Sequence, residues 1–410
     1  MHSQQGHHRP QRSPRPLRLE VLEDRCLLSY TLTDLTPILF RAGGLNNLGQ
    51  IASMVRGDDG LFHAVVWQPD AGIVRDLGEG GAEAINDVGQ VAGVAGAPGM
   101  GQYVVWDGDG VIMGKFSMFI SAINNAGQVA GSIDIGQGYS HAALWDSATG
   151  VQDLGSLGGR GEGDGSEAIN DAGVVVGGSY NAAGYEHAFV WDSTNGMQDL
   201  TPDATESFAG GINNAGQIVL AADGNAFLAE GGTFTRLGQW VPQAINNAGQ
   251  IVGRDLVLGT FHGVIYADGV LRDLNSLIQG GTGLTVFMAS EINDAGWIRA
   301  IAFDAHSHFH SVLLTPDDGG APRGADRGVS RLLVPVHEAN PMREITSQPP
   351  ASALPKGAPL DAVPPLPTDA VLARATDAVF ASSHRSHTPA ASAEWDVAGL
   401  ELGLITPLSM

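Results

Sequence analysis

The chain repeats one order of apolar and polar positions seven times. Each repeat holds four short apolar patches, which in the fourth copy are residues 167–169, 174–176, 187–191 and 197–200. The patches are rich in β-branched or aromatic residues and are bounded by turn residues, a pattern that is typical of strands. We therefore predict four short strands per repeat, joined by tight turns into an antiparallel meander.

A five-residue motif links the first two predicted strands of each repeat: an apolar residue, Asn, then Asn or Asp, any residue, and Gly. Asn favours an Asx turn and Gly accepts the positive φ that closes a type I turn with a bulge, so the motif predicts a hairpin. The copies recur every 33–47 residues, about 41 on average, which suits the four-stranded blade of a propeller. The motif Asn residues, which number the repeats 1 to 7, are Asn46, Asn86, Asn124, Asn170, Asn213, Asn246 and Asn293.

The two ends of the array complement each other. Residues 30–35 have the pattern of a fourth strand that belongs to no repeat, whereas repeat 7 stops after its third strand, residues 310–314. Pairing the two in one sheet would close a ring and leave no free sheet edge. The predicted fold class is therefore all-β: a seven-bladed β-propeller of four-stranded antiparallel blades over residues 29–316. Its last blade is closed by the N-terminal strand, and its N- and C-terminal flanks are disordered.

Histidine opens the third predicted strand in five repeats, and aspartate holds the matching position of the fourth strand in the same five. Repeats 2 and 5 lose both, having Gln102 with Gly114 and Asn225 with Arg236. The joint loss predicts contact, and we expect a partly buried hydrogen bond that holds the imidazole in one tautomer. Five equivalent copies favour a structural role, because an enzyme needs one asymmetric site. The predicted pairs are His63 with Asp76, His141 with Asp153, His187 with Asp199, His262 with Asp273 and, across the ring closure, His310 with Asp34.

Aromatic residues end the third predicted strand in five repeats. They are Trp67, Trp106, Trp145, Trp191 and Tyr266. At this spacing we expect them to pack between neighbouring blades. A row of exposed aromatics that stack on sugars is the alternative.

The chain is acidic, with 44 Asp and Glu against 21 Lys and Arg. This balance argues against nucleic acid as a partner, because phosphate binding needs local positive charge. An acidic surface could hold calcium, but such surfaces usually confer solubility. The single cysteine, Cys26, precedes the repeats, so no disulfide forms within the chain. The sequence contains no run of ~18 apolar residues, so we predict no membrane span.

The flanks differ in composition from the repeats. The stretch before residue 19 is basic and Pro-rich, and we expect it to be disordered. Residues 317–410 contain 12 of the 21 prolines, which predicts linker or disordered material, with a possible short helix over residues 368–382. The predicted organisation is thus a basic segment at 1–28, the repeat array at 29–316 and a Pro- and Ala-rich tail at 317–410.

Two stretches resemble known bacterial families. The phrases HAFVW (187–191), AINNAGQ (244–250) and QDLG (152–155) resemble the HAF extracellular repeats, and the resemblance spans residues 29–316, with repeats 2 and 5 departing most. Residues 19–29 resemble the LEPR-XLL segment of surface and secreted proteins, with Asp24 where that family usually has Pro. The resemblances imply export and an extracellular or cell-surface location. The HAF family brings no settled biochemical activity.

Other motifs receive structural interpretations. The order His-Ser-His-Phe-His at 306–310 is expected to place three imidazoles on one face of a strand, ~6.5–7 Å apart, a spacing that can bind Zn²⁺. We predict no metal site there, because His310 already belongs to a His–Asp pair and no further ligand is obvious. Residues 107–110 and 161–165 look superficially like calcium loops but lack the 12-residue spacing with a terminal Glu, and 107–110 should form a turn.

Together these patterns predict a monomeric, secreted or cell-surface repeat module that binds or adheres to a polymer or protein, with no catalytic residue and no cofactor. The alternative is a propeller enzyme, a lyase or glycoside hydrolase with a carboxylate site at one channel mouth. Glycosidase chemistry needs two carboxylates ~5–10 Å apart. A cluster of Asp, Glu and His that departs from sevenfold repetition at one face would favour the enzyme.

Overall fold

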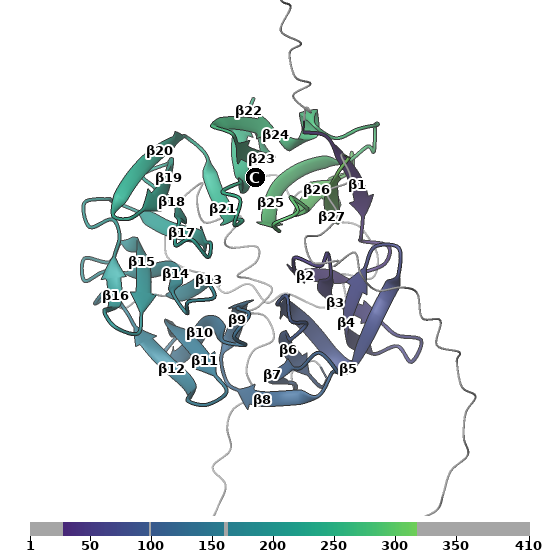
Figure 1. Ribbon diagram of the computed structural model, residues 1–410, viewed down its shortest axis with the longest axis horizontal. Coiled ribbons are helices and arrows are strands. Elements are labelled where there is room, and N and C mark those ends of the chain that lie inside the picture. The colour runs from purple at the N-terminus through teal and green to yellow at the C-terminus, as the bar shows by residue number, and fades with distance from the viewer. Residues whose placement is uncertain (1–27, 98–99, 160–162, 318–410) are drawn as a thin grey trace, which may run out of the picture. The chain divides into compact units, whose positions relative to one another are not determined.

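The computed structural model describes residues 28–97, 100–159 and 163–317, whose strands form six antiparallel sheets arranged in a ring (Figure 1). This part of the chain is all-β, with 27 strands and one short 3-10 helix, η1 (Leu274–Ser276). No helix within these ranges is long and apolar enough to cross a membrane. The predicted export segment up to residue 27, Cys26 and the predicted helix at 368–382 lie outside the described residues.

The strands follow one another around the ring in chain order. The largest sheet contains β2 (Arg41–Leu45), β3 (Ile51–Arg56), β4 (Phe62–Gln68), β5 (Gly72–Ile85), β6 (Val91–Ala95), β7 (Gln102–Trp106) and β8 (Ile112–Phe116). Two four-stranded sheets follow: β9 (Phe119–Ile123), β10 (Val129–Gly136), β11 (Tyr139–Asp146) and β12 (Gly150–Gly155), then β13 (Gly165–Ile169), β14 (Val175–Tyr180), β15 (Glu186–Asp192) and β16 (Gly196–Asp199). The next two are β17 (Ser207–Ile212), β18 (Ile218–Ala222), β19 (Asn225–Glu230) and β20 (Thr233–Gly238), then β21 (Val241–Ile245), β22 (Ile251–Val257), β23 (Thr260–Ala267) and β24 (Val270–Asp273). The last is β25 (Thr285–Ile292), β26 (Ile298–Phe303), β27 (Phe309–Pro316) and β1 (Tyr30–Asp34).

The sheet of seven strands departs from the expected separate sheets. Strand β5 pairs with β4 as far as Glu79, opposite His63, and from Gly80 onward it pairs with β6. Gly80 allows the chain to pass directly from one pairing to the next, because its φ is +146° and a Cβ there would lie 2.0 Å from the carbonyl oxygen of Val94. Repeats 1 and 2 therefore share one unbroken strand, and six sheets are present where separate blades were expected.

The two ends of the array meet in the last sheet. Strand β1 pairs antiparallel with β27 in a register that places Tyr30 opposite Pro316 and Asp34 opposite Val312. Tyr30 also contacts the connection between β24 and β25, because its N–H donates to the carbonyl of Leu277 at 2.9 Å. The predicted pairing of the two chain ends is confirmed.

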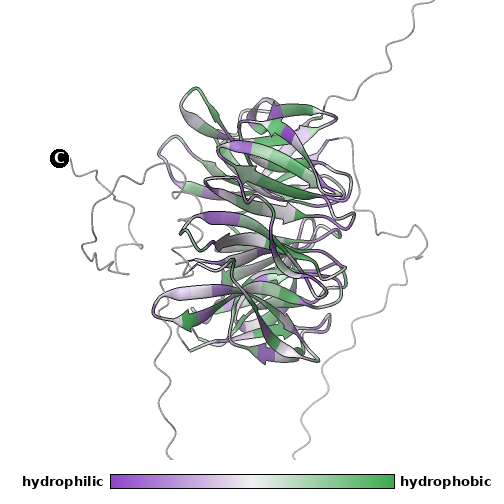
Figure 2. Ribbon diagram, turned by 90° about the vertical axis from the view of Figure 1, so that its left-hand side faces the viewer, coloured by the Kyte–Doolittle hydropathy of each residue, from purple (hydrophilic) through white to green (hydrophobic). Residues whose placement is uncertain are grey.

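Apolar side chains fill the spaces between neighbouring groups of strands, and the ribbon of Figure 2 shows hydrophobic residues along the strands. One apolar cluster joins Ala130 and Leu144 to Val175, Phe189 and Trp191 of the following sheet. Across the described ranges there are seven such clusters, which contain almost all the buried apolar side chains. Burial of this kind, at roughly 25 cal/mol per Å² of apolar surface, holds the sheets against each other.

The four predicted tryptophans lie in these clusters. Trp67, Trp106, Trp145 and Trp191 are between 1% and 6% exposed, and Trp67 shares its cluster with Leu313 from the far end of the array. The prediction that they pack between neighbouring repeats is confirmed. A sugar-stacking row of these tryptophans is wrong, because their rings are not accessible to a ligand.

We expect an engineered disulfide to form between positions 31 and 315, which lie opposite each other in the β1–β27 ladder. In a Cys26→Ser background, Thr31→Cys with Thr315→Cys should oxidise readily, since opposed residues in an antiparallel pair lie within disulfide reach. Closing so long a loop should raise the free energy of unfolding by about 3–5 kcal/mol in urea melts compared with and without reductant.

The matched control shifts the register by one residue, using Leu32→Cys with Thr315→Cys. Neighbouring residues of a strand point to opposite faces of the sheet, so this pair should stay reduced. Equal oxidation of both pairs would contradict the register and the closure.

Candidate functional site

The seven motif Asn side chains form a closed ring of hydrogen bonds between repeats. Each Nδ2 donates to the backbone carbonyl of the motif Asn in the next repeat, at 2.8–3.2 Å. Asn293 of repeat 7 donates to Asn46 of repeat 1 at 3.0 Å, which closes the ring. All seven residues are 3–5% exposed. A buried amide or carbonyl without a partner would cost about 1–3 kcal/mol, so each repeat stabilises its neighbour.

The same side chains also shape the hairpins. In repeat 5, Asn213 Oδ1 accepts from the N–H groups of Ala215 (3.1 Å) and Gln217 (3.0 Å). Its Nδ2 donates to Gln217 Oε1 at 2.8 Å as well as to the carbonyl of Asn246 at 3.1 Å. The motif turn expected from the sequence is therefore present, and one side chain both forms the turn and binds the next repeat.

A second ring is formed by the residue that follows each motif Asn. The N–H of each member donates to a side-chain oxygen of the next member at 2.7–2.9 Å, and Asp294 returns to Asn47. The members, in order, are Asn47, Asp87, Asn125, Asp171, Asn214, Asn247 and Asp294.

Carboxylates and amides alternate around most of this second ring. Asp87 Oδ2 accepts from Nδ2 of Asn47 (2.9 Å) and of Asn125 (3.2 Å). Asp171 accepts in the same way from Asn125 and Asn214, and Asp294 accepts from Asn47 and Asn247. Each charge is thus flanked by two amide donors, and the alternation is interrupted only where Asn214 precedes Asn247.

A cavity of about 190 Å³ lies at the centre of the two rings and is lined by three residues from every repeat: the apolar residue before the motif Asn, the motif Asn and its successor. The lining Asn and Asp side chains are all hydrogen-bonded within the rings. Because every repeat contributes equivalent residues, the cavity contains no asymmetric acid–base pair. Its geometry suits closure of the ring.

An ion pair marks the junction between repeats 7 and 1. Arg299 Nη2 lies 2.7 Å from Glu291 Oε1, and Glu291 Oε2 accepts from the N–H of Leu45 at 2.7 Å. Arg299 Nη1 donates to the carbonyl of Ala42 at 3.3 Å. The repeats that close the circle are therefore joined by charged hydrogen bonds in addition to the ring.

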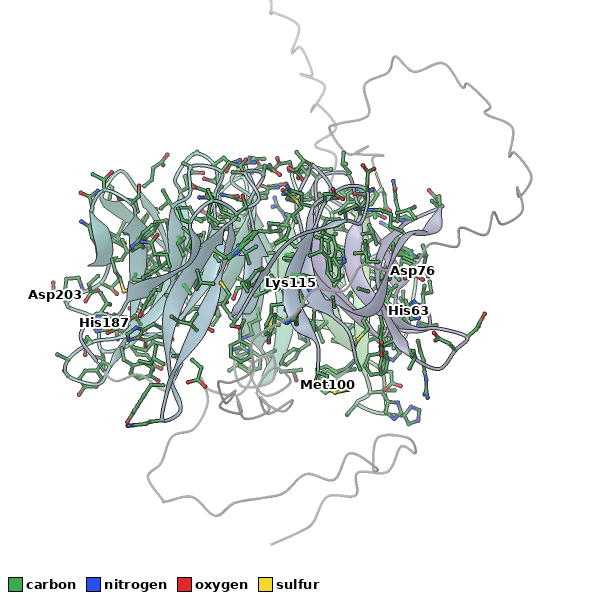
Figure 3. All side chains as sticks on the ribbon, turned by 90° about the horizontal axis from the view of Figure 1, so that it is seen from below. His63, Asp76, Met100, Lys115, His187 and Asp203 are labelled. Carbon is green, nitrogen blue, oxygen red and sulfur yellow. The ribbon has the colours of Figure 1, made fainter. Side chains whose placement is uncertain are left out.

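The structure brings together all five predicted His–Asp pairs. The Nδ1–Oδ distances are 3.0 Å for His63 with Asp76, 2.9 Å for His141 with Asp153, 2.7 Å for His187 with Asp199, 2.7 Å for His262 with Asp273 and 2.8 Å for His310 with Asp34. A carboxylate oxygen of each Asp also accepts the N–H two residues later, and in three of the pairs that Asp is the last residue of its strand: Asp34, Asp199 and Asp273. Because the carboxylate accepts, Nδ1 carries the proton. Figure 3 shows His63 and Asp76 beside each other on the outer strands.

Repeats 2 and 5 replace the pair in different ways. Arg236 Nε and Nη2 donate to Asn225 Oδ1 at 3.0 and 2.5 Å, which reverses the donor and acceptor positions. In repeat 2, a Cβ at Gly114 would lie 2.3 Å from the ring of Trp145. Packing of the next repeat's tryptophan therefore excludes any side chain at that position.

His63 hydrogen-bonds to two carboxylates, one at each ring nitrogen. Its Nε2 lies 3.1 Å from Asp59 Oδ2, while Nδ1 contacts Asp76. Hydrogen bonds to Asp59 and then to Asp76 raise the pKa of the imidazole. The N–H of Leu61, followed by His63, lowers the pKa of the Asp59 carboxyl.

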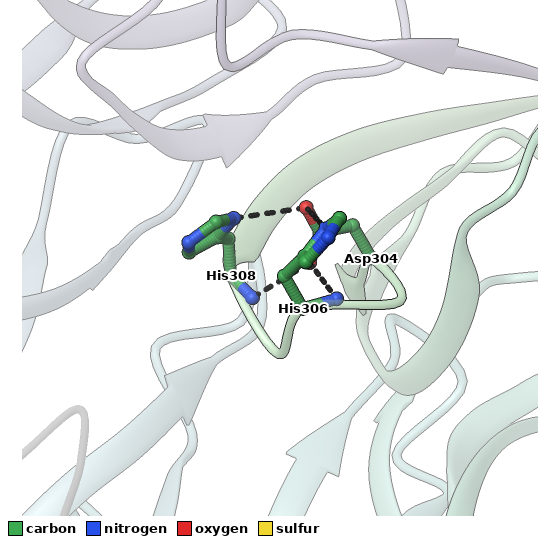
Figure 4. A group of neighbouring side chains, drawn as sticks. All are labelled: Asp304, His306 and His308. Carbon is green, nitrogen blue, oxygen red and sulfur yellow. Dashed lines mark hydrogen bonds and ion pairs between the residues drawn. The ribbon is translucent and has the colours of Figure 1, made fainter. Parts of the chain in front are cut away.

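His306, His308 and His310 do not lie on one face of a strand, so the expected row of three imidazoles is wrong. Strand β27 begins at Phe309, and residues 304–308 form a turn in which Ser307 has a φ of +66°. His306 and His308 instead lie on the turn around Asp304 (Figure 4). The N–H of His308 is the largest of several contacts that hold the pKa of the Asp304 carboxyl well below its usual range.

The two calcium-like stretches serve as turns or anchors where they are described. Asp107 Oδ1 accepts from the N–H groups of Asp109 (2.9 Å) and Val111 (2.8 Å), which confirms the predicted turn. Asp164 is buried and accepts from Ser179 Oγ at 2.9 Å and from the N–H of Tyr180 at 2.8 Å. Residues 160–162 lie outside the described ranges.

Sequence reasoning missed the second ring and Asp304. The signal for the ring is the change between Asn and Asp at one motif position, which suggests contact between copies. Asp304 lies outside the His-Ser-His-Phe-His stretch, and its role depends on a turn that the alternating pattern does not indicate.

No family model matches the sequence, and no curated protein matches it. Solved structures similar to this chain include TolB from Acinetobacter baumannii, at 12% identity over 71% of this chain and 63% of that chain, with a TM-score of 0.36. An acylaminoacyl peptidase from Pyrococcus horikoshii is similar at 14% identity over 62% of this chain and 48% of that chain, with a TM-score of 0.38. A lectin from Burkholderia pseudomallei is similar at 10% identity over 70% of this chain and 96% of that chain, also with a TM-score of 0.38. The chain thus spans 63% and 48% of the first two. Similarity at this level does not distinguish a binding protein from an enzyme.

Replacing the ring amide of repeat 5 by a carboxylate, Asn213→Asp, should lower the free energy of unfolding by about 3 kcal/mol. The substitution keeps the turn acceptor but places an oxygen against the carbonyl of Asn246 and against Gln217 Oε1. Urea unfolding measures the loss. The matched control, Gln217→Glu, adds a charge beside the same amide while keeping the acceptor, and should cost about 1 kcal/mol or less. Equal losses would contradict the role of the inter-repeat donor.

The contribution of His63 to stability should depend on pH. Its pKa is raised in the folded protein, so its contribution is fully present below the unfolded value of ~6.5 and is lost as pH rises through the folded value. The difference in unfolding free energy between the wild type and His63→Gln should therefore shrink from pH 5.5 to pH 9. NMR titration of Asp59→Asn should show a lower His63 pKa, and an unchanged titration would contradict the assignment.

Proposed function

We propose that residues 29–316 form a seven-bladed β-propeller that is exported and binds a polymer or protein partner without catalysing a reaction. Counting β5 twice, as the outer strand of one blade and the inner strand of the next, turns six sheets into seven blades. The seven inter-repeat Asn bonds support this count, as do the seven apolar clusters in the described ranges. The resemblances to HAF repeats and to the LEPR-XLL segment support export.

The closed double ring is the observation that carries the proposal. It fixes every repeat to the next at one mouth of the channel and uses the polar groups of that mouth in its own hydrogen bonds. A scaffold held in this way presents its loops in defined positions, which is the arrangement that recognition sites favour. Binding is therefore assigned to the opposite end of the blades.

The hairpins between the second and third strands of the blades emerge at that opposite end, and we name them the hairpin face. They connect β3 to β4, β6 to β7, β10 to β11, β14 to β15, β18 to β19, β22 to β23 and β26 to β27. Large apolar side chains stand exposed there: Met100 is 82% exposed, Tyr185 52% and Leu258 fully exposed. Figure 3 shows Met100 at the lower rim. Large exposed apolar side chains on surface loops are typical of an interaction surface.

A propeller enzyme is the second candidate, and one observation favours it. Asp304, His306 and His308 form a cluster that departs from sevenfold repetition, on the hairpin face. The cluster offers one carboxylate, however, whereas glycosidase chemistry needs two flanking the scissile bond. The binding role therefore takes precedence.

Binding should be detectable on a glycan array and on a set of insoluble polysaccharides, and it should depend on the hairpin face. We expect the triple variant Met100→Ser, Tyr185→Ser, Leu258→Ser to bind the captured ligand at least ~10-fold more weakly, about 1.4 kcal/mol. The matched control, Val88→Ser, Val111→Ser, Val270→Ser, removes exposed apolar residues from the other end of the blades and should bind normally. Shortened or unsaturated sugar products released from a bound polymer would favour the enzyme instead.

A further inference from the structure

The hairpin of repeat 7 has the same backbone as the hairpin of repeat 4. In repeat 4, Asn181 Oδ1 accepts from the N–H groups of Ala183 (2.9 Å) and Tyr185 (3.1 Å). In repeat 7, Asp304 Oδ1 accepts from those of His306 (2.8 Å) and His308 (2.9 Å). Each hairpin is followed by the histidine of a His–Asp pair, His187 or His310, six residues after the turn-forming side chain. The two hairpins can therefore be compared position by position.

The chemistry at these equivalent positions differs. In repeat 4, Asn181 Nδ2 donates to His187 Nε2 at 3.2 Å, which satisfies the imidazole lone pair while Nδ1 donates to Asp199. In repeat 7 the amide is replaced by a carboxylate, and Asp304 Oδ2 lies 4.0 Å from His310 Nε2. With Nδ1 of a neutral His310 donating to Asp34, both facing atoms are electron-pair donors. An amide hydrogen joins them in repeat 4, and a cation is the group that would join them in repeat 7.

The two remaining differences add ligands at the same place. Ala183 and Tyr185 of repeat 4 correspond to His306 and His308 of repeat 7. Asp304 Oδ2 lies 2.9 Å from His308 Nδ1 and 3.7 Å from His306 Nδ1, and one ligand atom from each of the three residues lies within 4.8 Å of the others. Figure 4 shows both imidazoles turned toward the carboxylate. A tetrahedral Zn²⁺ site with bonds near 2.0–2.1 Å has ligand atoms about 3.4 Å apart, a value that the separations of 2.9, 3.7 and 4.0 Å bracket.

We propose that Asp304, His306, His308 and Nε2 of His310 bind one divalent transition-metal ion of the Zn²⁺ class on the hairpin face. Imidazole and carboxylate ligands suit such ions. Asp34 holds His310 from behind through Nδ1, as outer carboxylates do for metal-binding histidines. The site thus spans the ring closure, because Asp34 comes from β1 and its partner from β27. His306 and His308, with side chains 81% and 66% exposed, leave the ion accessible to solvent or to a ligand.

Titration of the full chain with Co²⁺ tests the proposal, because four-coordinate Co²⁺ absorbs visible light far more strongly than the six-coordinate aqueous ion. We expect one equivalent to bind with a four-coordinate spectrum that Zn²⁺ displaces. His306→Ala with His308→Ala should abolish the band and raise Kd at least ~100-fold, and Asp304→Asn should also abolish the band. Asp34→Asn keeps the turn acceptor and should raise Kd by roughly 10- to 100-fold. Circular dichroism and the urea midpoint of each variant establish that it folds.

Two controls make the outcome decisive. His7→Ala with His8→Ala removes neighbouring histidines of the N-terminal segment and should leave the band unchanged. Converting repeat 4 by Asn181→Asp, Ala183→His and Tyr185→His should create a second equivalent with the same spectrum. Any of three results would overturn the proposal. They are a spectrum that shows six-coordinate Co²⁺ alone, a four-coordinate band that survives His306→Ala with His308→Ala, and a band that disappears in His7→Ala with His8→Ala.

Discussion

The fold depends on one hydrogen bond made seven times, from the amide of a motif Asn to the carbonyl of the next repeat's Asn. Apolar packing between sheets is strong but non-directional, and it does not by itself fix how many repeats complete a circle. The amide bond is directional and buried, and each repeat both donates and accepts one. Because an open array would leave a donor at one end and a carbonyl at the other, this interaction favours closure. Pairing of β1 with β27 then joins the chain ends in the same circle.

Much of the fold could be predicted from the sequence because the signals are local and repeated. The motif Asn and Gly dictate a turn, the apolar patches dictate strands, and the joint loss of His and Asp in repeats 2 and 5 indicates that these residues are in contact. The continuous β5 could not be predicted, because it depends on the backbone conformation of Gly80. A glycine in the sequence permits that conformation but does not indicate that the chain adopts it. The inter-repeat rings were also missed, since their partners lie 33 to 47 residues apart, or 247 at the ring closure, and meet only through the geometry of the circle.

The candidate site was less predictable than the scaffold. Alternating histidines at 306, 308 and 310 have the period of a strand, and that pattern suggested three imidazoles on one face. The turn at Asp304 overrides the pattern, because its carboxylate binds the N–H groups of His306 and His308 and reverses the chain. What distinguishes repeat 7 is visible only when its hairpin is aligned with that of repeat 4. In a repeat protein, the informative residues are those that depart from the repetition while keeping its backbone.

The alternation of the second ring has an arithmetical consequence. Seven positions on a circle can hold at most three carboxylates without placing two side by side, and the ring holds that maximum with Asp87, Asp171 and Asp294. Parity therefore forces one seam, at Asn214 and Asn247, where two amides meet and no carboxylate bridges them. No further Asn of this ring can be replaced by Asp without placing two carboxylates side by side, because every remaining Asn adjoins an Asp. An eighth repeat could remove the seam and add a fourth charge, so the odd number of repeats itself sets the electrostatics of the channel entrance.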